Sequence, residues 1–311
     1  MNPVTFTIAI PAYKRQFLQA CIDSILAQTY QDFEIVIVDD HSPQHLEEVI
    51  GRYSQNPHIR YYKNAVGFGG KNVVGNWNKC LEYANGEFMI CMGDDDMLTP
   101  TCLADYVSLI EKFPQLDIYH TRTLIIDEAS HPIDIQEARP ERESAYSMLW
   151  HLWKGRRQFI GDWLFRTSTL RKRGGFFSLP YAWEADHICA ISAASATGVA
   201  NTSGIGFLYR ENRNCITKRT DNSKDKLQAI KHAKAWYQDF LREEPDNETD
   251  RIYQQLLKKD INSHFHKRMA NDLGDAFHQH PWSLLYWILN MQRLGIPLKT
   301  FVRACALAMI K

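Results

Sequence analysis

The sequence lacks the features that mark several large classes of protein. No stretch reaches the roughly 18–20 uninterrupted apolar residues of a membrane-spanning helix, and Met1 leads into a strand-like segment without the regions of a signal peptide. The 36 Lys and Arg residues equal the 36 Asp and Glu residues, so no net positive field attracts nucleic acid. We therefore expect a cytoplasmic protein that does not bind nucleic acid.

Cysteine and glycine patterns exclude further classes. The seven cysteines are odd in number and none are spaced as CxxC, which argues against a disulfide framework and a structural zinc site. The glycine-rich segment Gly67–Asn72 matches neither GxGxxG nor a P-loop. The chain also has no GxSxG and no HExxH, so we do not expect serine-hydrolase or zinc-protease chemistry.

What the chain does contain is an alternation of short apolar strands and amphipathic helices. Strands are predicted at 6–10, 34–38, 59–62 and 87–92, and helices at 15–28, after Pro43 and at 72–84. This alternation predicts βαβ units, and thus an α/β fold with a mostly parallel, Rossmann-like sheet flanked by helices. From 221 onward the pattern is mainly helical and charged. We expect an α/β domain over 1–220 and a helical C-terminal extension over 221–311.

Polar clusters follow three of the predicted strands, namely Pro11–Tyr13, Asp39–Asp40 and Asp94–Asp96. Ligands of parallel α/β sheets bind outside the carboxyl ends of the strands, so the topology would gather these clusters in one crevice. Asp39–Asp40 reads either as a simple turn or as a carboxylate that accepts hydrogen bonds from a ribose or base. The clusters together predict a nucleotide site.

The run Asp94, Asp95, Asp96 is the most chemically specific of these clusters. Adjacent carboxylates repel one another unless a cation joins them, and a divalent metal bound together with diphosphate oxygens is the natural partner. A helix N-cap before Pro100 is the structural alternative, but a cap needs only one aspartate. Farther along, Glu184 and Asp186 either cap the following helix or supply a general base.

Taken in order, these segments resemble the family-2 glycosyltransferases of GT-A fold, the group that builds bacterial polysaccharides. The resemblance covers roughly residues 4–215 and rests on Thr7–Tyr13, Phe33–Ser42, Asn72–Glu87, Met92–Pro100, Gly174–Phe176, Trp183–Asp186 and Tyr209–Arg210. It implies an inverting transfer from a nucleotide-diphosphate sugar, with uridine expected, to a glycan or lipid-linked acceptor in surface polysaccharide synthesis. It also implies a Mn²⁺ or Mg²⁺ cofactor, a donor half over about 1–100 and an acceptor half over about 101–220.

The resemblance also assigns roles on the donor side. Pro11 and Tyr13 would line the nucleotide pocket, Asp39 would contact the base or ribose, and Lys71 would join the donor-binding residues. Arg210 would belong to a basic loop that swings over the diphosphate.

For the metal, the resemblance makes Asp95 the first ligand, with Asp94 near both ribose and metal and Asp96 as a cap or supporting group. Gly93 stands where the family usually has an acid. The family's base is usually the aspartate of a Glu-Asp pair. Here Ala185 splits the pair, so Asp186 is the expected base and Glu184 the second choice.

Two rival functions stay open from the sequence alone. A nucleotidyltransferase that forms sugar nucleotides also uses an acidic metal site on a Rossmann-like sheet, although Pro11–Arg15 lacks the glycines of its phosphate loop. The second rival is a non-catalytic relative that binds carbohydrate or nucleotide. The intact acidic run and Asp186 favour an enzyme over it.

The end of the chain differs in composition from the rest. Pro281–Gly295 combines tryptophan, tyrosine and aliphatic residues, and Lys299 and Arg303 follow. Such a segment either covers the catalytic domain or a homodimer face, or it lies in a membrane interface. We expect the first arrangement for 282–311. Peripheral contact with the inner face of the plasma membrane is the alternative.

Overall fold

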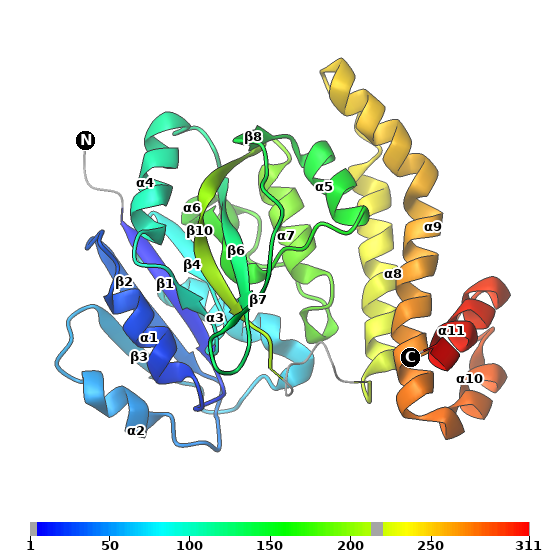
Figure 1. The fold of residues 1–311 in the computed structure, drawn as a ribbon, viewed down its shortest axis with the longest axis horizontal. Coiled ribbons are helices and arrows are strands. Elements are labelled where there is room, and N and C mark those ends of the chain that lie inside the picture. The colour runs from blue at the N-terminus through cyan, green and yellow to red at the C-terminus, as the bar shows by residue number, and fades with distance from the viewer. Residues whose placement is uncertain (1–4, 213–219, 311) are drawn as a thin grey trace. The chain divides into compact units, whose positions relative to one another are not determined.

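The structure is a computed structural model that describes residues 5–212 and 220–310 (Figure 1). Its contacts divide the chain into two compact units. Unit 1 comprises Met1–Ser178 and Ala185–Asn212, and unit 2 comprises Leu179–Glu184 and Arg213–Lys311. Leu179–Glu184 joins unit 2 and interrupts unit 1, and the expected domain bounds of 1–220 and 221–311 stay a prediction.

The strands of unit 1 form one ten-stranded sheet in the order β3-β2-β1-β4-β9-β6-β10-β5, with β7 on β6 and β8 on β10. The strands are β1 (Phe6–Ala12), β2 (Phe33–Asp39), β3 (Ile59–Lys63), β4 (Phe88–Cys91), β5 (Met97–Leu98), β6 (Ile118–Ile126), β7 (Pro132–Ile135), β8 (Arg142–Glu143), β9 (Trp163–Arg166) and β10 (Val199–Arg210). Pairing is parallel from β3 to β4 and between β6 and β10, whereas β9 is antiparallel to β4 and β6. The expected α/β class is confirmed, with a mixed sheet beyond its first four strands.

Helices cover both faces of this sheet, because its strands are apolar on both sides. They are α1 (Leu18–Leu26), α2 (Glu47–Ile50), α3 (Val73–Tyr83), α4 (Cys102–Lys112), α5 (Ala145–Trp153), α6 (Thr167–Lys172) and α7 (Ala185–Ala194), with 3₁₀ turns η1 (Gly51–Tyr53), η2 (Gly70–Asn72) and η3 (Ile160–Asp162). Side chains alternate between the two faces of a strand. Ile8 and Ile10 of β1 therefore share one core with α1 and α4, while α3 packs on β1 and β2. Asn72 starts α3 by accepting a hydrogen bond from the amide of Gly75.

Unit 2 is helical. Its elements are η4 (Pro180–Ala182), α8 (Ser223–Phe240), α9 (Glu248–Gln279), η6 (Pro281–Ser283), α10 (Leu284–Asn290) and α11 (Leu298–Ile310). Asn247 caps α9 by accepting a hydrogen bond from the amide of Asp250. The helices α8 and α9 run side by side, and α11 packs along α9 (Figure 1). Within the described ranges, no helix is both long enough and apolar enough to cross a membrane.

Candidate active site

The parallel strands end together at one edge of the sheet. Ala12 at the end of β1 pairs with Asp39 at the end of β2, and Asp39 pairs with Lys63 at the end of β3. The amide of Asp40 donates to the carbonyl of Ala12 at 2.9 Å, which ties the chain beyond β2 to β1. The predicted gathering of polar segments at this edge is therefore observed.

Asp94 joins the chain after β4 to the end of β1. Its Oδ2 accepts hydrogen bonds from the backbone amides of Tyr13 and Lys14, both at 2.6 Å. Residues some eighty positions apart in sequence thus share one carboxylate, which is buried. The Tyr13 ring beside it is exposed, while Pro11 is half-buried.

The other two aspartates of the run face different partners. Asp95 is the most exposed of the three, with 14% of its side chain accessible, and Lys14 Nζ lies 3.0 Å from its Oδ2. The same oxygen accepts a hydrogen bond from Asn212 Nδ2. Asp96 is buried and its Oδ1 accepts from the amide of Arg210 at 2.9 Å. The carboxylate of Asp95 is therefore partly exposed, whereas those of Asp94 and Asp96 are buried and bind backbone amides.

Negative charge is concentrated here beyond what the surrounding groups neutralise. Burial, and then repulsion from Asp95, raises the pKa of Asp94 to about 6. The same two causes raise the pKa of Asp96 well above its ordinary value. Such a cluster favours an added cation.

The carboxylates after β2 organise the neighbouring loops. Asp39 is fully buried, and it accepts hydrogen bonds from the amide of Ser42 and the hydroxyl of Tyr61, both at 2.7 Å. Asp40 accepts from the amides of Phe68 and Gly69 at 2.7 and 2.9 Å. Asp40 thus fixes the glycine-rich segment against the strand end. Lys71, which lies within that segment in η2, is exposed.

The expectation of a mobile loop at Arg210 is wrong. Arg210 is the last residue of β10 and is only 2% exposed. Its guanidinium donates to the backbone carbonyls of Asp95 and Asp127 at 2.8 and 3.0 Å and lies over the ring of Phe17. Residues 213–217 of the predicted loop lie outside the described residues. Arg210 is therefore a buried residue that holds the backbone of the aspartate segment, because its guanidinium donates hydrogen bonds to the backbone carbonyls that converge on it.

Asp186 and Glu184 fall in different units and have different surroundings. Asp186 lies in the first turn of α7 in unit 1, with 22% of its side chain accessible and His187 Nε2 at 3.8 Å. Glu184 is buried in unit 2, where Arg268 Nε donates to its Oε1 at 2.7 Å. The structure therefore leaves Asp186 the better candidate for a base, and gives Glu184 a structural partner.

A family comparison agrees with this arrangement. The model of glycosyl transferase family 2 matches residues 7–174, more than half of the 311-residue chain. The chain belongs to this family. Membership of this family favours glycosyl transfer over the two rival functions that the sequence left open.

Known proteins share parts of the sequence and most of the fold. The Campylobacter jejuni GalNAc(5)-diNAcBac-PP-undecaprenol beta-1,3-glucosyltransferase is 33% identical over 100 residues, and the match spans 32% of each protein. The chain thus spans about a third of that relative's length.

Two solved structures are similar to most of the chain. S. aureus TarS 1–349 in complex with UDP-GlcNAc has a TM-score of 0.64 and 15% identity, covering 97% of this chain and 79% of that one. The mannosyltransferase PcManGT from Pyrobaculum calidifontis, in complex with GDP-Man and Mn²⁺, has a TM-score of 0.55 and 15% identity, covering 98% and 86%. At this identity the likeness shows the fold alone, and it confirms the expected GT-A fold.

The aspartates fit a divalent cation that a nucleotide shares. Among the described residues no group of three or more His, Cys, Asp or Glu side chains is placed to hold a metal by itself. Magnesium-like ions are commonly bound by one or two carboxylates plus substrate phosphates and water. One outward carboxylate at Asp95, backed by the buried Asp94, suits that kind of site.

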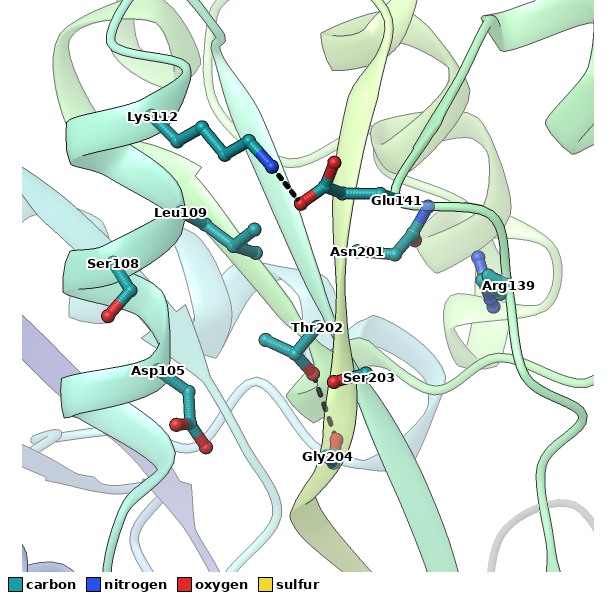
Figure 2. Close-up of a pocket in the computed structure, with 10 residues that line it drawn as sticks. All are labelled: Asp105, Ser108, Leu109, Lys112, Arg139, Glu141, Asn201, Thr202, Ser203 and Gly204. Carbon is teal, nitrogen blue, oxygen red and sulfur yellow. Dashed lines mark hydrogen bonds and ion pairs between the residues drawn. The ribbon is translucent and has the colours of Figure 1, made fainter.

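A separate pocket of about 310 Å³ lies between α4 and the first part of β10 (Figure 2). It is lined by Asp105, Ser108, Leu109, Lys112, Arg139, Glu141, Asn201, Thr202, Ser203 and Gly204. Asn201 pairs with His120 early in β6, whereas Arg210 pairs with Ile126 at its end. The pocket therefore lies toward the opposite end of these strands from the aspartates, and none of its lining residues is a predicted site residue.

Sequence reasoning missed several groups that shape the site. Lys14 and Asn212 both contact Asp95, and Tyr61 holds Asp39. Lys14 directly follows the Pro11–Tyr13 cluster, so its position was a usable signal. Tyr61 reaches the site because β3 pairs with β2, and Asn212 follows β10, which pairs with β6; the sequence does not show which side chains these pairings bring to the aspartates.

Proposed function

We propose that this glycosyltransferase moves a sugar from a nucleoside diphosphate sugar, with a UDP-sugar as the first expectation, to a hydroxyl of a glycan or lipid-linked saccharide. We further propose inversion at the anomeric carbon and a role in surface polysaccharide synthesis. Support comes from the UDP-GlcNAc in the TarS structure and from the C. jejuni relative, whose name specifies a PP-undecaprenol-linked saccharide. All six described cysteines are free thiols, which is consistent with a reducing, cytoplasmic compartment.

The shared carboxylate of Asp94 is the observation that carries this proposal. Asp94 accepts hydrogen bonds from the amides of Tyr13 and Lys14. These bonds hold the end of β1 beside the partly exposed carboxylate of Asp95. The exposed ring of Tyr13, the ammonium group of Lys14 and the partly exposed carboxylate of Asp95 then share one edge. These are the groups needed for a base, a diphosphate and its cation, so we assign the donor half to about 1–100.

We assign the nucleotide contacts within that half as follows. The exposed ring of Tyr13, with Pro11 beside it, offers a face on which a pyrimidine can stack. Asp39 is fully buried, so we propose that it acts by holding Tyr61 and Lys63 at the ends of β2 and β3. Lys63 Nζ lies 3.7 Å from its Oδ2. We also propose that the exposed Lys71 of η2 meets the donor's negative charge.

Asp95 would hold a Mn²⁺ or Mg²⁺ ion, with Asp94 and Asp96 supporting it from behind. When bound, such an ion acts as a Lewis acid that offsets the charge growing on the departing diphosphate. Arg210 keeps the aspartate segment in register by bonding the carbonyl of Asp95 and the carboxylate of Asp96. Lys14 supplies a further positive charge beside Asp95.

Asp186 would activate the acceptor, in the acceptor half over about 101–220. A carboxylate that takes the proton of the attacking hydroxyl makes it a better nucleophile. Attack from the face opposite the nucleotide breaks the bond to the diphosphate as the new glycosidic bond forms, which inverts the anomeric carbon. The partial exposure of Asp186 at the start of α7 leaves it open to an acceptor.

Calorimetric titration of UDP, with and without Mn²⁺, tests the donor site. We expect the unchanged chain to bind UDP more tightly with Mn²⁺, and Asp95→Asn to lose most of that metal-dependent gain. Glu111→Gln, an exposed carboxylate on α4 of the same unit, is the matched control and should bind as the unchanged chain does.

Other results would point elsewhere. Tight GDP or dTDP binding without UDP binding would keep the transferase assignment and replace the nucleobase. Equal binding by Asp95→Asn and the unchanged chain would remove Asp95 as the metal ligand. If the unchanged chain bound none of UDP, GDP and dTDP, the proposal of a donor site at these residues would be overturned.

A further inference from the structure

The elements η6, α10 and α11 at the end of unit 2 carry several exposed apolar side chains. We define the α10–α11 surface by its exposed apolar residues Trp282, Leu285, Leu289, Leu298, Val302 and Met309, which are 58 to 82% exposed. Large apolar side chains scattered singly over a surface are common. Six within 28 residues of chain are a concentration that marks an interaction surface.

These residues are distinct from the ones that hold the two helices in place. Trp287, Phe301 and Ala304 are buried, and the rings of Trp287 and Phe301 both contact Phe277 of α9. Gly274 of α9 also lets α11 approach closely, since a Cβ there would lie 3.1 Å from Leu307 Cβ. The helices therefore use one face for the core of unit 2 and leave the other exposed. The expectation that 282–311 covers the catalytic domain or a homodimer face stays a prediction.

The spacing of the exposed residues places them on one face of each helix. On α10, Leu285 and Leu289 are four residues apart, and on α11 Leu298 and Val302 have the same spacing, so each pair lies on one helical face. Lys299 and Arg303 each follow one of the α11 residues and are exposed. Basic side chains thus border the apolar stripe, where their alkyl stems can lie on it while their charges reach outward.

The charge of this part of the chain is one-sided. From Ala276 to the end the sequence has no Asp or Glu, but it contains Arg293, Lys299, Arg303 and Lys311. Lys224 of α8 adds another cation at α10, with Nζ 4.1 Å from the centre of the Tyr286 ring. A strip of aromatic and aliphatic side chains bordered by cations is complementary to an anionic lipid surface.

We propose that the α10–α11 surface docks on the surface of an anionic lipid bilayer. The apolar residues would enter the boundary between headgroups and acyl chains, while the cations remain among the phosphates. Docking goes beyond the proposed transfer reaction and does not depend on it. It would keep the transferase at the surface where lipid-linked saccharides lie.

A second copy of the chain fits this surface less well. A symmetric dimer brings the same patch of both copies together, so Lys299 and Arg303 would face cations without an acid in the segment to pair with them. A lipid surface supplies the missing negative charge. The charge distribution therefore favours lipid over self-association.

Vesicle flotation with the full chain tests the proposal. Vesicles of phosphatidylcholine alone are compared with vesicles that also contain phosphatidylglycerol, at low and high salt. We expect binding to the anionic vesicles and weaker binding at high salt, since salt screens the cations. K299Q/R303Q should weaken binding to anionic vesicles roughly 30-fold, on the order of five-fold per cation. L289S/L298S should weaken it on the order of ten-fold or more per leucine.

Matched controls lie on α9 of the same unit. K258Q/K259Q removes two exposed cations, and I252S/L256S removes two exposed apolar side chains; both should bind as the unchanged chain does. UDP titration of each variant shows whether the donor site is intact, which separates failure of docking from failure of the proposed function.

Two results would overturn the proposal. One is an unchanged chain that does not float with anionic vesicles. The other is equal weakening by the α9 controls, which would mean that the α10–α11 surface is not the contact. Dimers in sedimentation that L289S/L298S dissociates, without any vesicle binding, would assign the surface to a second copy instead.

Discussion

Asp94 and Asp95 are neighbours in sequence, yet their carboxylates have different surroundings. Asp94 is enclosed by the amides of Tyr13 and Lys14, whereas Asp95 is partly exposed beside the Lys14 ammonium. Asp94 and Asp95 are the two central residues of a turn, in which the amide of Asp96 donates to the carbonyl of Gly93 at 3.3 Å, so their side chains point in different directions. A run of three acids therefore yields one outward ligand and two buried charges, and the buried ones should respond to pH.

The raised pKa of Asp94 predicts a pH-dependent response to metal. An unfolded aspartate titrates near 3.9, and burial with repulsion from Asp95 raises the pKa of Asp94 to about 6. Between those values the native state binds more protons than the unfolded state. The contribution of Asp94 to the free energy of unfolding is thus present at low pH and is lost as pH rises to about 6. A bound cation would offset the charge of the ionised Asp94 and restore this contribution to the free energy of unfolding. Mn²⁺ should therefore raise Tm more at about pH 8, where Asp94 is ionised, than at about pH 5.

Melting curves of the unchanged chain and Asp94→Asn, with and without Mn²⁺, check this. The asparagine keeps an oxygen for the two amides but removes the charge, so its Mn²⁺-dependent gain should vary less between the two pH values. An equal gain at both pH values in the unchanged chain would contradict the assignment.

We predict that Asp186 contributes to turnover and Glu184 to stability. Asp186→Asn should lower turnover by roughly 10²–10⁴-fold, the usual contribution of a general base, with UDP affinity unchanged. Glu184→Gln should retain turnover within a few-fold but lower Tm, because it removes the negative charge that pairs with the Arg268 guanidinium. Rates of nucleoside diphosphate release, with titration and melting, separate the two. The assignments would be reversed if Glu184→Gln lost turnover and Asp186→Asn did not.

At the scale of elements, the crossing of α9 and α11 depends on one small residue. A Cβ at Gly274 would lie 3.1 Å from Leu307 Cβ and 3.2 Å from the Ala304 carbonyl. We expect Gly274→Val to force the helices apart and to lower stability by about 1–3 kcal/mol.

Gly51 is the control for that substitution. It has helical backbone angles and nothing near its position for a Cβ, so Gly51→Ala should be neutral or slightly stabilising. Thermal melting measures both variants. An unchanged Tm for Gly274→Val would show that α11 is not held tightly against α9.

The segment before α7 is another feature decided at this scale. Tyr181, Ala182 and Glu184 all have left-handed backbone, with φ of 58, 54 and 72°. Side chains other than glycine rarely adopt it, at a cost of order 1–3 kcal/mol each. Surrounding structure must therefore hold this segment, and Trp183 is the side chain that anchors it in unit 2.

For the whole molecule, Trp183 shows that unit 2 is assembled from two distant stretches of chain. Its indole Nε1 donates to Asp272 Oδ2 at 3.0 Å, and its ring packs with Lys226 and Arg268 at 4.2 and 4.8 Å. Trp183→Ala should destabilise unit 2 by about 3–5 kcal/mol. Hydrogen exchange should then show faster exchange in α8 and α9.

Trp150→Ala provides the comparison, because Trp150 is a partly buried tryptophan of α5 in unit 1. It should leave exchange in α8 and α9 unchanged. If both substitutions had the same effect on α8 and α9, the anchoring role of Trp183 would be lost.

The sequence by itself determined the local structure and the edge of the sheet where the chemistry lies. Apolar runs ending at Pro11, Asp39 and Gly93 predicted the strands, because period and length are local properties. Parallel strands must end on one edge, so the meeting of these segments followed from topology alone. The role of Asp95 as the first metal ligand stays a prediction, and the structure shows only that it is the most exposed of the three aspartates.

Tertiary structure alone decided which side chains are buried and which partners they meet. The sequence placed Arg210 on a mobile loop, because it cannot show that β10 continues to that residue and that backbone carbonyls converge on its guanidinium. It separated the units near residue 220, because only folding brings Trp183 to Asp272, 89 positions away. Such contacts join residues far apart in the chain, and no local pattern encodes them.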